Sequence, residues 1–308
     1  MKTVRVFAPA SVANMGCGFD VMGFALDDIG DILEMTASDG EGIAITNRTD
    51  IPLPEDIEAN VITPVIRKFF EMTGLSGHID VSVCRKIFPG SGIGSSAASS
   101  AAAAFGMNEL FGRPLSGDDL VVCAMEGENL ASGGYHADNA APALLGGIIL
   151  IRGYEPLDLV RLPVPDDFYC TVVHPRIVVS TKAARDVLPK SVPMHDAVCQ
   201  WGNVGGLVAG LYSGDIALVG RSMKDSVAEP YRKHFIPDFD DLREATLKAG
   251  AIAMNISGSG PSVFSLSADL ETARKVGAAM REHFSEREIR SDIYVAKVAS
   301  TGARPLEP

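Results

Sequence analysis

The chain has 308 residues, enough for two domains of ordinary size, and its 46% hydrophobic and 21% charged residues predict a globular protein with a real core. Its formal net charge of −12 argues against binding to nucleic acid or to an anionic membrane surface, since either would need basic patches. Five scattered cysteines without a C-x-x-C pair favour neither a disulfide framework nor a zinc site, so a reduced, cytoplasmic location is the simplest interpretation.

The first half of the chain alternates between predicted strands and helices. Residues 4–8 alternate polar and apolar side chains as a strand does, and they lack the basic and long apolar regions of a signal peptide. No apolar run reaches the roughly 18 residues that a membrane-spanning helix needs. Further strands are expected at 31–37, 42–46, 78–87 and 146–151, and helices at 60–74 and 116–132.

The second half begins after a proline-rich segment at 155–170, which is a candidate domain junction. The pattern as a whole predicts an α+β fold of two domains, residues 1–165 and 166–308. The expected elements are strands at 171–175, 253–267 and 292–299 and helices at 196–212, 214–227, 238–249 and 269–284.

Residues 88–105 (FPGSGIGSSAASSAAAAF) combine closely spaced glycines with a strong helix former. The glycines let a ligand approach the backbone without a Cβ in the way, and the alanines behind them favour a helix. The first turn of a helix leaves N–H groups unpaired at its partly positive end, which suits a phosphate chain. A flexible linker is the alternative, but linkers are not bracketed by a strand and a helix.

This loop does not match the common nucleotide-binding patterns. No lysine follows the glycines as in G-x-x-x-x-G-K-[ST], and the third glycine comes one residue too early for G-x-G-x-x-G. Without that lysine, the charge of bound phosphates must be handled by Mg²⁺ and by other groups.

Two oxygen-bearing side chains are candidate ligands of Mg²⁺, which commonly takes one or two protein oxygens together with water and phosphate. Ser96 opens the predicted helix behind the glycines. Glu128 lies on an otherwise apolar helical face with Val121 and Ala124. The alternative is that Glu126 and Glu128 simply solvate the end of their helix.

A second polar cluster follows that helix. His136, Asp138 and Asn139 lie in what the flanking glycines predict to be a loop, and loops held by rigid elements often carry function. An aspartate beside a transferred hydroxyl can accept its proton or orient it. Alone, this cluster would be a turn with side-chain caps, but Glu128 eight residues earlier favours a site.

Charged residues elsewhere suit an amino-acid ligand. Asn14 and Asp20 flank the glycines of an early turn, and Asp20 adjoins apolar residues, where an unpaired charge would be costly. Arg185 and Arg232 could each hold a carboxylate in a bidentate pair, although a surface position is the default for an arginine. A second glycine turn at 258–261 either presents N–H groups to the site or is a tight bulged turn.

The chain resembles the GHMP family of small-molecule kinases in three blocks that occur in the family's order. They are APASVANMGCGFDVMGFAL at 8–26, GSGIGSSAASSAAAA at 90–104 and NISGSGPSVFSL at 255–266. The segments GGYHADNAAPALLGG and STKAARDVLP are similar to those of the branch that acts on L-homoserine. The resemblance covers residues 4–300, and its one departure is Phe88, with Pro89 after it, where the family often has a proline two residues before the first glycine.

The resemblance implies an N-terminal domain like ribosomal protein S5 and a ferredoxin-like C-terminal domain, with the site between them. Catalysis would depend on Asp138, Glu128 and Ser96, the last two holding Mg²⁺. The implied ATP-binding residues are Phe88, Pro89, Gly90, Ser91, Gly92, Ile93, Gly94, Ser95, Ser96, Ala97 and Ala98 around the phosphates, with Asn60 and Val61 at the adenine. The implied homoserine-binding residues are Asn14, Asp20, His136, Asp138, Asn139, Arg185, Arg232 and Gly260, with both arginines facing the carboxylate.

The implied reaction moves the γ-phosphoryl group of ATP to the side-chain hydroxyl of L-homoserine, in threonine biosynthesis. Asp138 would act as the general base or would bind the amino group of the substrate, and both roles stay open. A homodimer is expected from the family. The alternatives are a GHMP kinase for mevalonate, shikimate or a sugar, and a non-catalytic nucleotide-binding relative, which would be expected to lack Glu128 or Asp138.

Overall fold

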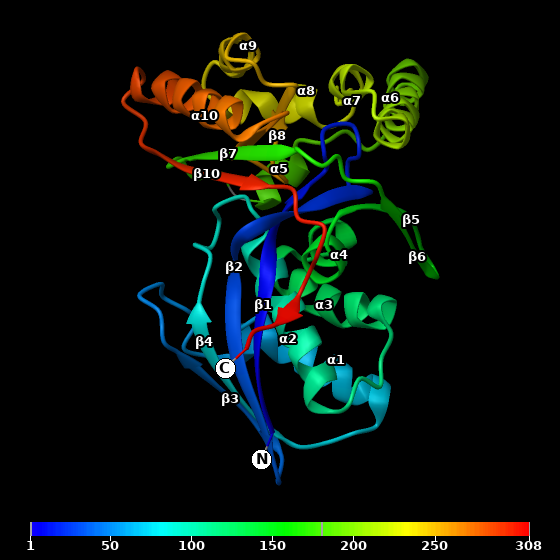
Figure 1. The fold of residues 1–308 in the computed structure, drawn as a ribbon, viewed down its shortest axis with the longest axis vertical. Coiled ribbons are helices and arrows are strands. Elements are labelled where there is room, and N and C mark those ends of the chain that lie inside the picture. The colour runs from blue at the N-terminus through cyan, green and yellow to red at the C-terminus, as the bar shows by residue number, and fades with distance from the viewer. Residues whose placement is uncertain (1, 180, 308) are drawn as a thin grey trace.

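The structure, a computed structural model, describes residues 2–179 and 181–307 and is built on two sheets, one above the other in Figure 1. In this part of the chain the larger sheet has seven strands: β1 (Lys2–Ala13), β2 (Met22–Ser38), β3 (Gly42–Asn47), β4 (His78–Arg85), β5 (Ile148–Tyr154), β6 (Leu157–Leu162) and β11 (Arg304–Pro305). Their order is β11-β1-β2-β4-β3, while β5 pairs with β2 and carries β6 at the edge. The β3–β4 pair is parallel and the other pairs are antiparallel.

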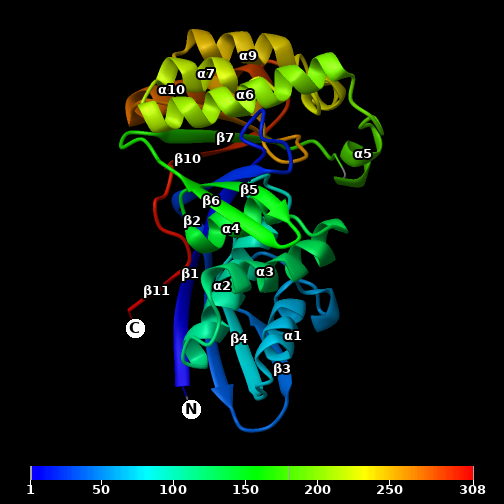
Figure 2. The ribbon, with the colours of Figure 1, turned by 90° about the vertical axis from the view of Figure 1, so that its right-hand side faces the viewer.

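Helices cover one face of this sheet (Figure 2). They are α1 (Ile62–Thr73), α2 (Ser95–Leu110), α3 (Gly117–Ser132) and α4 (Ala137–Leu145), and a 3-10 turn at Ile57–Ala59 precedes α1. The alanine-rich α2 lies between strands β1 and β2 and the three other helices. Nearly every residue of α2 is buried, so its small side chains let these neighbours approach closely.

The smaller sheet has the order β10-β7-β9-β8, with antiparallel pairs throughout. Its strands are β7 (Tyr169–Pro175), β8 (Ala253–Ile256), β9 (Val263–Ser267) and β10 (Ser291–Lys297). The longer helices above it in Figure 1 are α6 (Met194–Ser213), α7 (Ile216–Ser222), α9 (Phe239–Lys248) and α10 (Leu270–Ser285). Two short helices, α5 (Thr181–Asp186) and α8 (Glu229–Arg232), and a 3-10 turn at Lys233–Phe235 complete the described elements.

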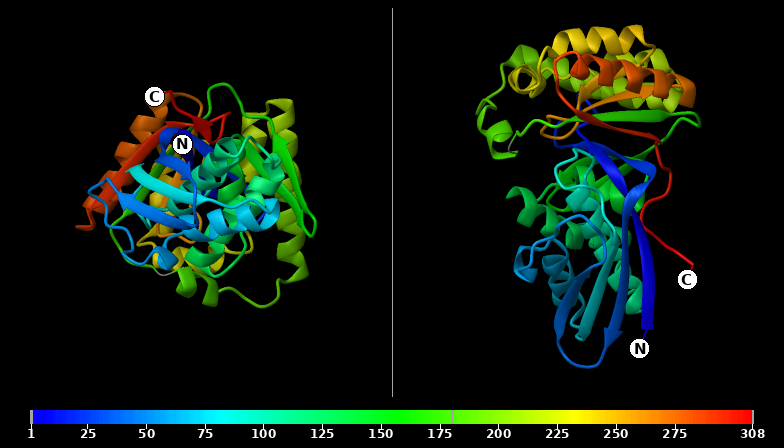
Figure 3. Two further views of the ribbon diagram at one scale, coloured as in Figure 1. Left: turned by 90° about the horizontal axis from the view of Figure 1, so that it is seen from below. Right: turned by 90° about the vertical axis from the view of Figure 1, so that its left-hand side faces the viewer.

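One apolar cluster connects the two sheets. It contains Phe24 of β2 and Phe264 of β9, whose ring centroids lie 5.7 Å apart in an edge-to-face contact. After β10 the chain returns to the larger sheet, where β11 pairs with β1 (Figure 3). Residues 299–307 therefore lie with the first sheet, although the sequence assigned them to the second domain. The division between residues 165 and 166 stays a prediction.

Most predicted elements are confirmed, and several differ from the prediction in type or extent. Residues 137–145 form α4 where a loop was expected, because their alanines favour a helix and Gly146 marks its end. Residues 253–267 form a two-stranded hairpin instead of one strand, because the glycines at 258 and 260 take positive φ values. The segment at 155–170 contains β6, which pairs with β5.

The helix expected over 214–227 is shorter than predicted. It is α7, Ile216–Ser222, and residues 223–227 form the connection to α8. No helix within the described ranges is both long and apolar enough to cross a membrane.

Candidate active site

A cleft of about 700 Å³ lies between the two sheets, within the size range of small-molecule sites. The β1–β2 loop, the loop before α2, the ends of α3 and α4 and the turn between β8 and β9 all contribute to its wall. The predicted site residues in this wall are Asn14, Asp20, Asn60, Val61, Phe88, Pro89, Gly90, Gly92, Gly94, Ser95, Ser96, Glu128, His136, Asp138, Asn139, Arg185, Arg232 and Gly260.

Four predicted residues lie behind the wall of the cleft. Ser91, Ile93, Ala97 and Ala98 are buried, and the last three belong to the apolar clusters of the protein. They support the loop from behind and do not reach the cleft in this structure, so their predicted contacts with ATP stay predictions.

The glycine-rich loop is fixed in one conformation that requires its glycines. Gly90, Gly92 and Gly94 have φ values of 81°, 72° and 63°, in the left-handed region. A Cβ at Gly92 would lie 2.2 Å from the Ser262 Oγ, and one at Gly94 would lie 2.2 Å from the Ser11 Oγ. The loop is therefore a rigid element and not a linker.

Helix α2 begins at Ser95 without a side-chain cap, so its first N–H groups are left for a ligand. The Ser95 hydroxyl is already engaged, because it donates to the Ile87 carbonyl at 2.9 Å. Ser96 follows it in the wall of the cleft. The helix dipole adds positive potential at this point, which favours an anion.

A buried ion pair that the sequence did not indicate lies beneath the start of α2. Lys86 Nζ is 2.8 Å from Asp31 Oδ2 and donates to the Ser95 carbonyl at the same distance. Asp31 is fully buried and accepts from the Ile87 N–H and the Ser99 hydroxyl. This lysine precedes the glycines, so a search for a lysine after the loop misses it.

Glu128 reaches the start of α2 because α3 packs closely against α2. Gly127 permits this approach, since a Cβ there would lie 2.0 Å from the Ser100 Oγ. The Glu128 side chain is buried, and its Oε1 has no hydrogen-bond partner among residues 2–179 and 181–307. Burial raises the pKa of Glu128 to about 7, an effect that the Ser96 hydroxyl partly offsets. Glu128 thus does not solvate the end of its helix.

His136 and Asp138 stand at the start of α4 and not in the predicted loop. Helix α4 lies tightly on β2, since a Cβ at Gly23 would be 1.7 Å from the Asp138 carbonyl oxygen. Burial, together with the charges of Asp20 and Glu128, raises the pKa of Asp138 to about 7. Burial lowers the pKa of His136, so its ring is neutral at pH 7.

Asn139 contacts the glycine-rich loop. Its Oδ1 accepts from the Ser11 hydroxyl at 2.9 Å, and the Ser11 N–H donates to the Ile93 carbonyl. The same oxygen would lie 3.0 Å from a Cβ at Gly94. Asn139 therefore braces the loop in this structure, and its contact with substrate stays a prediction.

Asp20 and Arg185 form a bidentate ion pair on the other side of the cleft. Arg185 Nη1 and Nη2 lie 3.1 and 3.2 Å from the two Asp20 carboxylate oxygens, and Nη2 also donates to His136 Nε2. The Arg185 side chain is 41% exposed and the Asp20 side chain is 30% exposed. Asp20 takes a φ of 57°, and its N–H donates to Asn14 Oδ1, which fixes the turn. Asp20 thus has the partner that its apolar neighbours require.

Arg232 is buried at the end of α8. Its Nε donates to the Ala184 carbonyl and its Nη1 to the Gly258 carbonyl, at 2.9 and 3.1 Å. The guanidinium also lies over the Phe19 ring, 5.0 Å from its centroid. Arg232 lines the cleft but binds backbone carbonyls, so its predicted contact with a substrate carboxylate stays a prediction.

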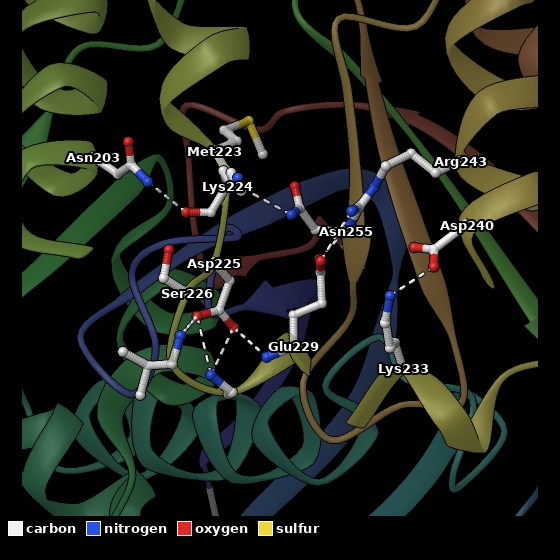
Figure 4. A network of polar contacts seen from close by, with 12 residues as sticks. Asn203, Met223, Lys224, Asp225, Ser226, Glu229, Lys233, Asp240, Arg243 and Asn255 are labelled. Atoms are coloured by element: carbon white, nitrogen blue, oxygen red, sulfur yellow. Dashed lines mark hydrogen bonds and ion pairs between the residues drawn. The ribbon is translucent and has the colours of Figure 1, made fainter. Parts of the chain in front are cut away.

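A network of polar contacts fixes the helix that carries Arg232 (Figure 4). Asp225 accepts from the backbone N–H groups of residues 227–229 at the start of α8. Glu229 forms an ion pair with Arg243 of α9. Because α8 is held at its first residues and against α9, the position of Arg232 is determined by the second sheet and its helices.

The glycine turn between β8 and β9 touches the glycine-rich loop directly. The Ser257 hydroxyl donates to the Gly92 carbonyl, and the Ser262 hydroxyl donates to the Ser91 carbonyl at 2.9 Å. His174 Nδ1 lies 2.8 Å from the Ser262 hydroxyl. The turn therefore joins the two sides of the cleft. Neither these serines nor His174 was predicted from the sequence, where the serine–glycine pattern of the turn was the one signal.

The end of the cleft next to α1 is apolar, which suits a flat base such as adenine. Its described lining residues are Leu53, Pro54, Ala59, Asn60, Val61, Ile62 and Val83. The Asn60 side chain accepts from the Ile62 N–H and so helps to start α1. The predicted adenine contacts of Asn60 and Val61 are placed in this region and stay predictions.

Comparisons with known proteins agree with this architecture. The family described as GHMP kinases N terminal domain matches residues 60–147, and the family described as GHMP kinases C terminal matches residues 207–286. The homoserine kinase of Chlorobium phaeobacteroides is 46% identical over 99% of this chain and 100% of its own length. The homoserine kinase of Pyrococcus abyssi is 38% identical over 95% of this chain and 96% of its own length.

Solved structures show the same fold. The homoserine kinase from Cytophaga hutchinsonii has a TM-score of 0.93 at 48% identity, covering 99% of this chain and 98% of that chain. The L. major mevalonate kinase in complex with R-mevalonate has a TM-score of 0.73 at 16% identity over 95% of each chain, which bears on the fold alone. The predicted two-domain α+β fold is confirmed.

Proposed function

The chain belongs to the GHMP kinase family, and we propose that it transfers the γ-phosphoryl group of ATP to the side-chain hydroxyl of L-homoserine. The products are ADP and O-phospho-L-homoserine, an intermediate of threonine biosynthesis. The observation that carries the proposal is the 46% identity to a curated homoserine kinase over the full length of both chains. The free cysteines and the negative net charge are compatible with the cytoplasm, where we place the enzyme.

The phosphate chain of ATP binds at the glycine-rich loop and the start of α2. The N–H groups there carry no side-chain cap, and the conformation of the loop is fixed by its glycines. Phosphoryl transfer has a loose transition state, so most catalysis comes from positioning and from charge neutralisation. A loop whose conformation is fixed by its glycines lowers the entropic cost of positioning the phosphates, and the start of α2 contributes to charge neutralisation.

Mg²⁺ is assigned to Glu128 and Ser96. The Glu128 Oε1 is buried without a hydrogen-bond partner in the described part of the chain, and Ser96 lies beside it, so hard oxygen donors converge next to the phosphate site. When bound, the ion neutralises charge on the β- and γ-phosphates. Glu128 fits this role because a buried carboxylate without a cation would be costly to ionise.

The side of the cleft that carries Asp20 and Arg185, here called the acceptor side, suits a zwitterionic substrate. Asp20 and Arg185 pair with each other, and both line the cleft. An amino acid can replace this internal pair by two external ones, its carboxylate on Arg185 and its ammonium group on Asp20. Mevalonate, which has a carboxylate but no ammonium group, would take Arg185 and leave Asp20 without a partner. A neutral sugar has no charge that could replace either member of the pair.

Asp138 is assigned as the group that accepts the proton of the homoserine hydroxyl. Its pKa is raised to about 7 by burial, which matches a general base that works near neutral pH. With Asp138→Asn we expect kcat to fall by roughly 10²–10⁴ while KM for homoserine changes little. A variant that keeps kcat and raises KM would instead assign Asp138 to the substrate amino group.

A coupled ADP-release assay with homoserine, mevalonate, shikimate and galactose as separate acceptors tests the proposed function. We expect turnover with homoserine and at most background with the others. Turnover with another acceptor in place of homoserine would make the chain a different GHMP kinase. ATP binding without turnover on any acceptor would make it a non-catalytic nucleotide-binding protein.

A further inference from the structure

Tyr154, the last residue of β5, has a hydroxyl that joins two segments of the acceptor side. The hydroxyl donates to the Asp20 carbonyl at 3.1 Å and accepts from the Ala137 N–H at 3.3 Å. Asp20 lies in the turn between β1 and β2, and Ala137 is the first residue of α4. Tyr154 is absent from the described wall of the cleft. It therefore connects the backbones of the turn and of the helix from behind the site.

The position of this hydroxyl is set by the larger sheet. Strand β5 runs antiparallel to the start of β2, and the Ile151 N–H donates to the Val21 carbonyl at 2.8 Å. Beyond this bond, β5 continues alongside the turn in the reverse direction, which brings Tyr154 to Asp20. A strand within a sheet is a firmer anchor than a loop, so the hydroxyl is a fixed point for both of its partners.

Helix α4 uses this contact in its first turn. His136 takes the N-cap position but gives the described helix no side-chain hydrogen bond. The first N–H groups of a helix have no partner within it, so they need one from outside. The Tyr154 hydroxyl supplies that partner to the Ala137 N–H. Because Asp138 follows Ala137 directly, the same bond fixes the backbone that carries Asp138.

Two links hold the turn against α4, and they respond differently to an acceptor. The first is made by side chains: the Asp20 carboxylate pairs with Arg185, whose Nη2 donates to His136 Nε2. Under the proposed function, the acceptor takes the place of this ion pair. The second link is Tyr154, which binds the Asp20 carbonyl and not its carboxylate. An amino acid that displaces the first link therefore leaves the second in place.

The Tyr154 hydroxyl stays a donor over the working pH range. A phenol has one proton to donate and can also accept, so its two contacts use both capacities. Burial raises the pKa of Tyr154 to about 12, although the Ala137 N–H acts against it. The charges of Asp138 and Asp20 act in the same direction as burial and raise this pKa further. The hydroxyl thus continues to donate to the turn at the pH values where both carboxylates are ionised.

We propose that Tyr154 is a positioning residue of the phosphoryl transfer, because its hydroxyl fixes Asp20 at the spacing from Asp138 that the acceptor must span. This inference rests on the proposed function, in which Asp20 binds the ammonium group and Asp138 receives the hydroxyl proton. L-Homoserine carries these two groups at opposite ends of a short carbon chain, so a shift of one carboxylate displaces the reacting oxygen. A misplacement of about 1 Å can lower a rate by roughly 10².

Tyr154→Phe tests the proposal, since it removes the hydroxyl and keeps the ring. Steady-state kinetics with ATP and homoserine are measured, and each rate is divided by the number of ATP sites found by calorimetric titration. We expect kcat to fall about tenfold and KM for homoserine to rise by less than about threefold, because Asp20 still binds the ammonium group. KM for ATP and the number of ATP sites should not change.

Tyr135→Phe is the matched control. It removes a hydroxyl of the same kind, whose 3.3 Å contact goes to Glu126 and not to the backbone of the site. This variant should keep the wild-type kcat and both KM values. An equal fall of kcat in the two variants would attribute the effect to the loss of any nearby tyrosine hydroxyl and would overturn the proposal.

Asp138→Asn separates positioning from a loss of folded enzyme. If Tyr154 acts by placing the acceptor against Asp138, adding Tyr154→Phe to Asp138→Asn should lower kcat further by less than about twofold. A change that acts on folding would lower the rate per chain equally in both backgrounds and would also lower the number of ATP sites. Equal falls of about tenfold in the two backgrounds therefore overturn the proposal.

The wild-type assay distinguishes failure of this inference from failure of the proposed function. If the wild type phosphorylates homoserine and Tyr154→Phe keeps its kcat, the inference alone is overturned. If the wild type does not phosphorylate homoserine, the proposed function is overturned, and the inference with it.

Discussion

The phosphate side and the acceptor side of the cleft are held in different ways. On the phosphate side, Lys86 and Asp31 form an ion pair beneath α2 whose side chains are 6% and 0% exposed. On the acceptor side, the ion pair of Asp20 and Arg185 is partly open to solvent and lies in the wall itself. The first pair shapes the site from behind, whereas the second lies in the wall where the proposed function puts the charged groups of the acceptor.

This difference explains how one cleft can bind two ligands that need different surroundings. ATP meets a preorganised loop, so little binding energy is lost in ordering it. Under the proposed function, the acceptor displaces an existing ion pair, so we expect a molecule that cannot replace both charges to be rejected. We therefore expect substitutions on the phosphate side to affect catalysis and stability, and those on the acceptor side to affect KM and specificity.

The largest effect is expected for Glu128→Gln. Without the carboxylate, Mg²⁺ loses its protein anion, and kcat should fall by on the order of 10³. At pH 8 without Mg²⁺ the same variant should be more stable than the wild type by about 3 kcal/mol, because a buried charge is removed. Steady-state kinetics and urea unfolding measure the two effects. Glu126→Gln, two residues earlier, is the control and should change neither.

Lys86→Met should destabilise the phosphate side of the cleft, because it leaves a buried charge unpaired. Asp31 would be left buried without its cation, which typically costs about 3–5 kcal/mol in unfolding free energy. Urea unfolding at pH 7 measures the loss. Lys68→Met, which removes an exposed ion pair with Glu71, should cost less than about 1 kcal/mol. Equal effects of the two variants would show that burial of the Lys86 pair is unimportant.

The pH dependence of stability and activity should run in opposite directions. Burial raises the pKa of Glu128 and of Asp138 to about 7, so the folded chain holds more protons than the unfolded chain between about pH 4 and 7. Stability without ligands should therefore fall as pH rises through this window and level off above it. Activity should rise through pH 7, because both carboxylates act when ionised. Thermal melts and kcat/KM profiles from pH 5 to 9 measure the two trends. A melting temperature that rises with pH together with kcat/KM would contradict the prediction.

Arg185→Ala tests the acceptor side. Loss of a bidentate charged partner should raise KM for homoserine about 10- to 100-fold, with little change in KM for ATP. Stability should change by less than about 1 kcal/mol, since the pair with Asp20 is partly exposed. Arg176→Ala, which removes a comparable exposed pair with Asp292, is the control. A similar rise in KM for ATP would remove the distinction between the two sides.

The smallest effect is expected for Ser262→Ala, which removes one contact between the two sides. Its hydroxyl donates to the Ser91 carbonyl, and a lost hydrogen bond is worth about 1 kcal/mol. KM for ATP should rise about fivefold while KM for homoserine stays within twofold. Ser267→Ala, at a buried β9 hydroxyl without a partner in the described chain, should change neither. A larger rise in KM for homoserine than in KM for ATP would place this turn on the acceptor side.

Local patterns in the sequence were enough to predict the elements that depend on neighbouring residues. The strand at 78–85, the glycine-rich loop and helix α2 were predictable because propensity and periodicity act over a few residues. The burial of Glu128 could also be predicted, since Val121 and Ala124 lie on the same face of α3. The start of α4 was missed, because glycines at both ends suggested a loop where they mark the boundaries of a helix.

Which distant residues share the cleft depends on how the two sheets pack against each other. Arg185 lies 165 positions from Asp20, and Ser262 lies 171 positions from Ser91, yet both pairs are in contact. Lys86 is close to the loop in sequence, but its role depends on Asp31 of a different strand. Such contacts follow from how the two sheets pack and not from any local pattern. The chemistry of each residue was therefore readable from the sequence, while its partner was set by packing.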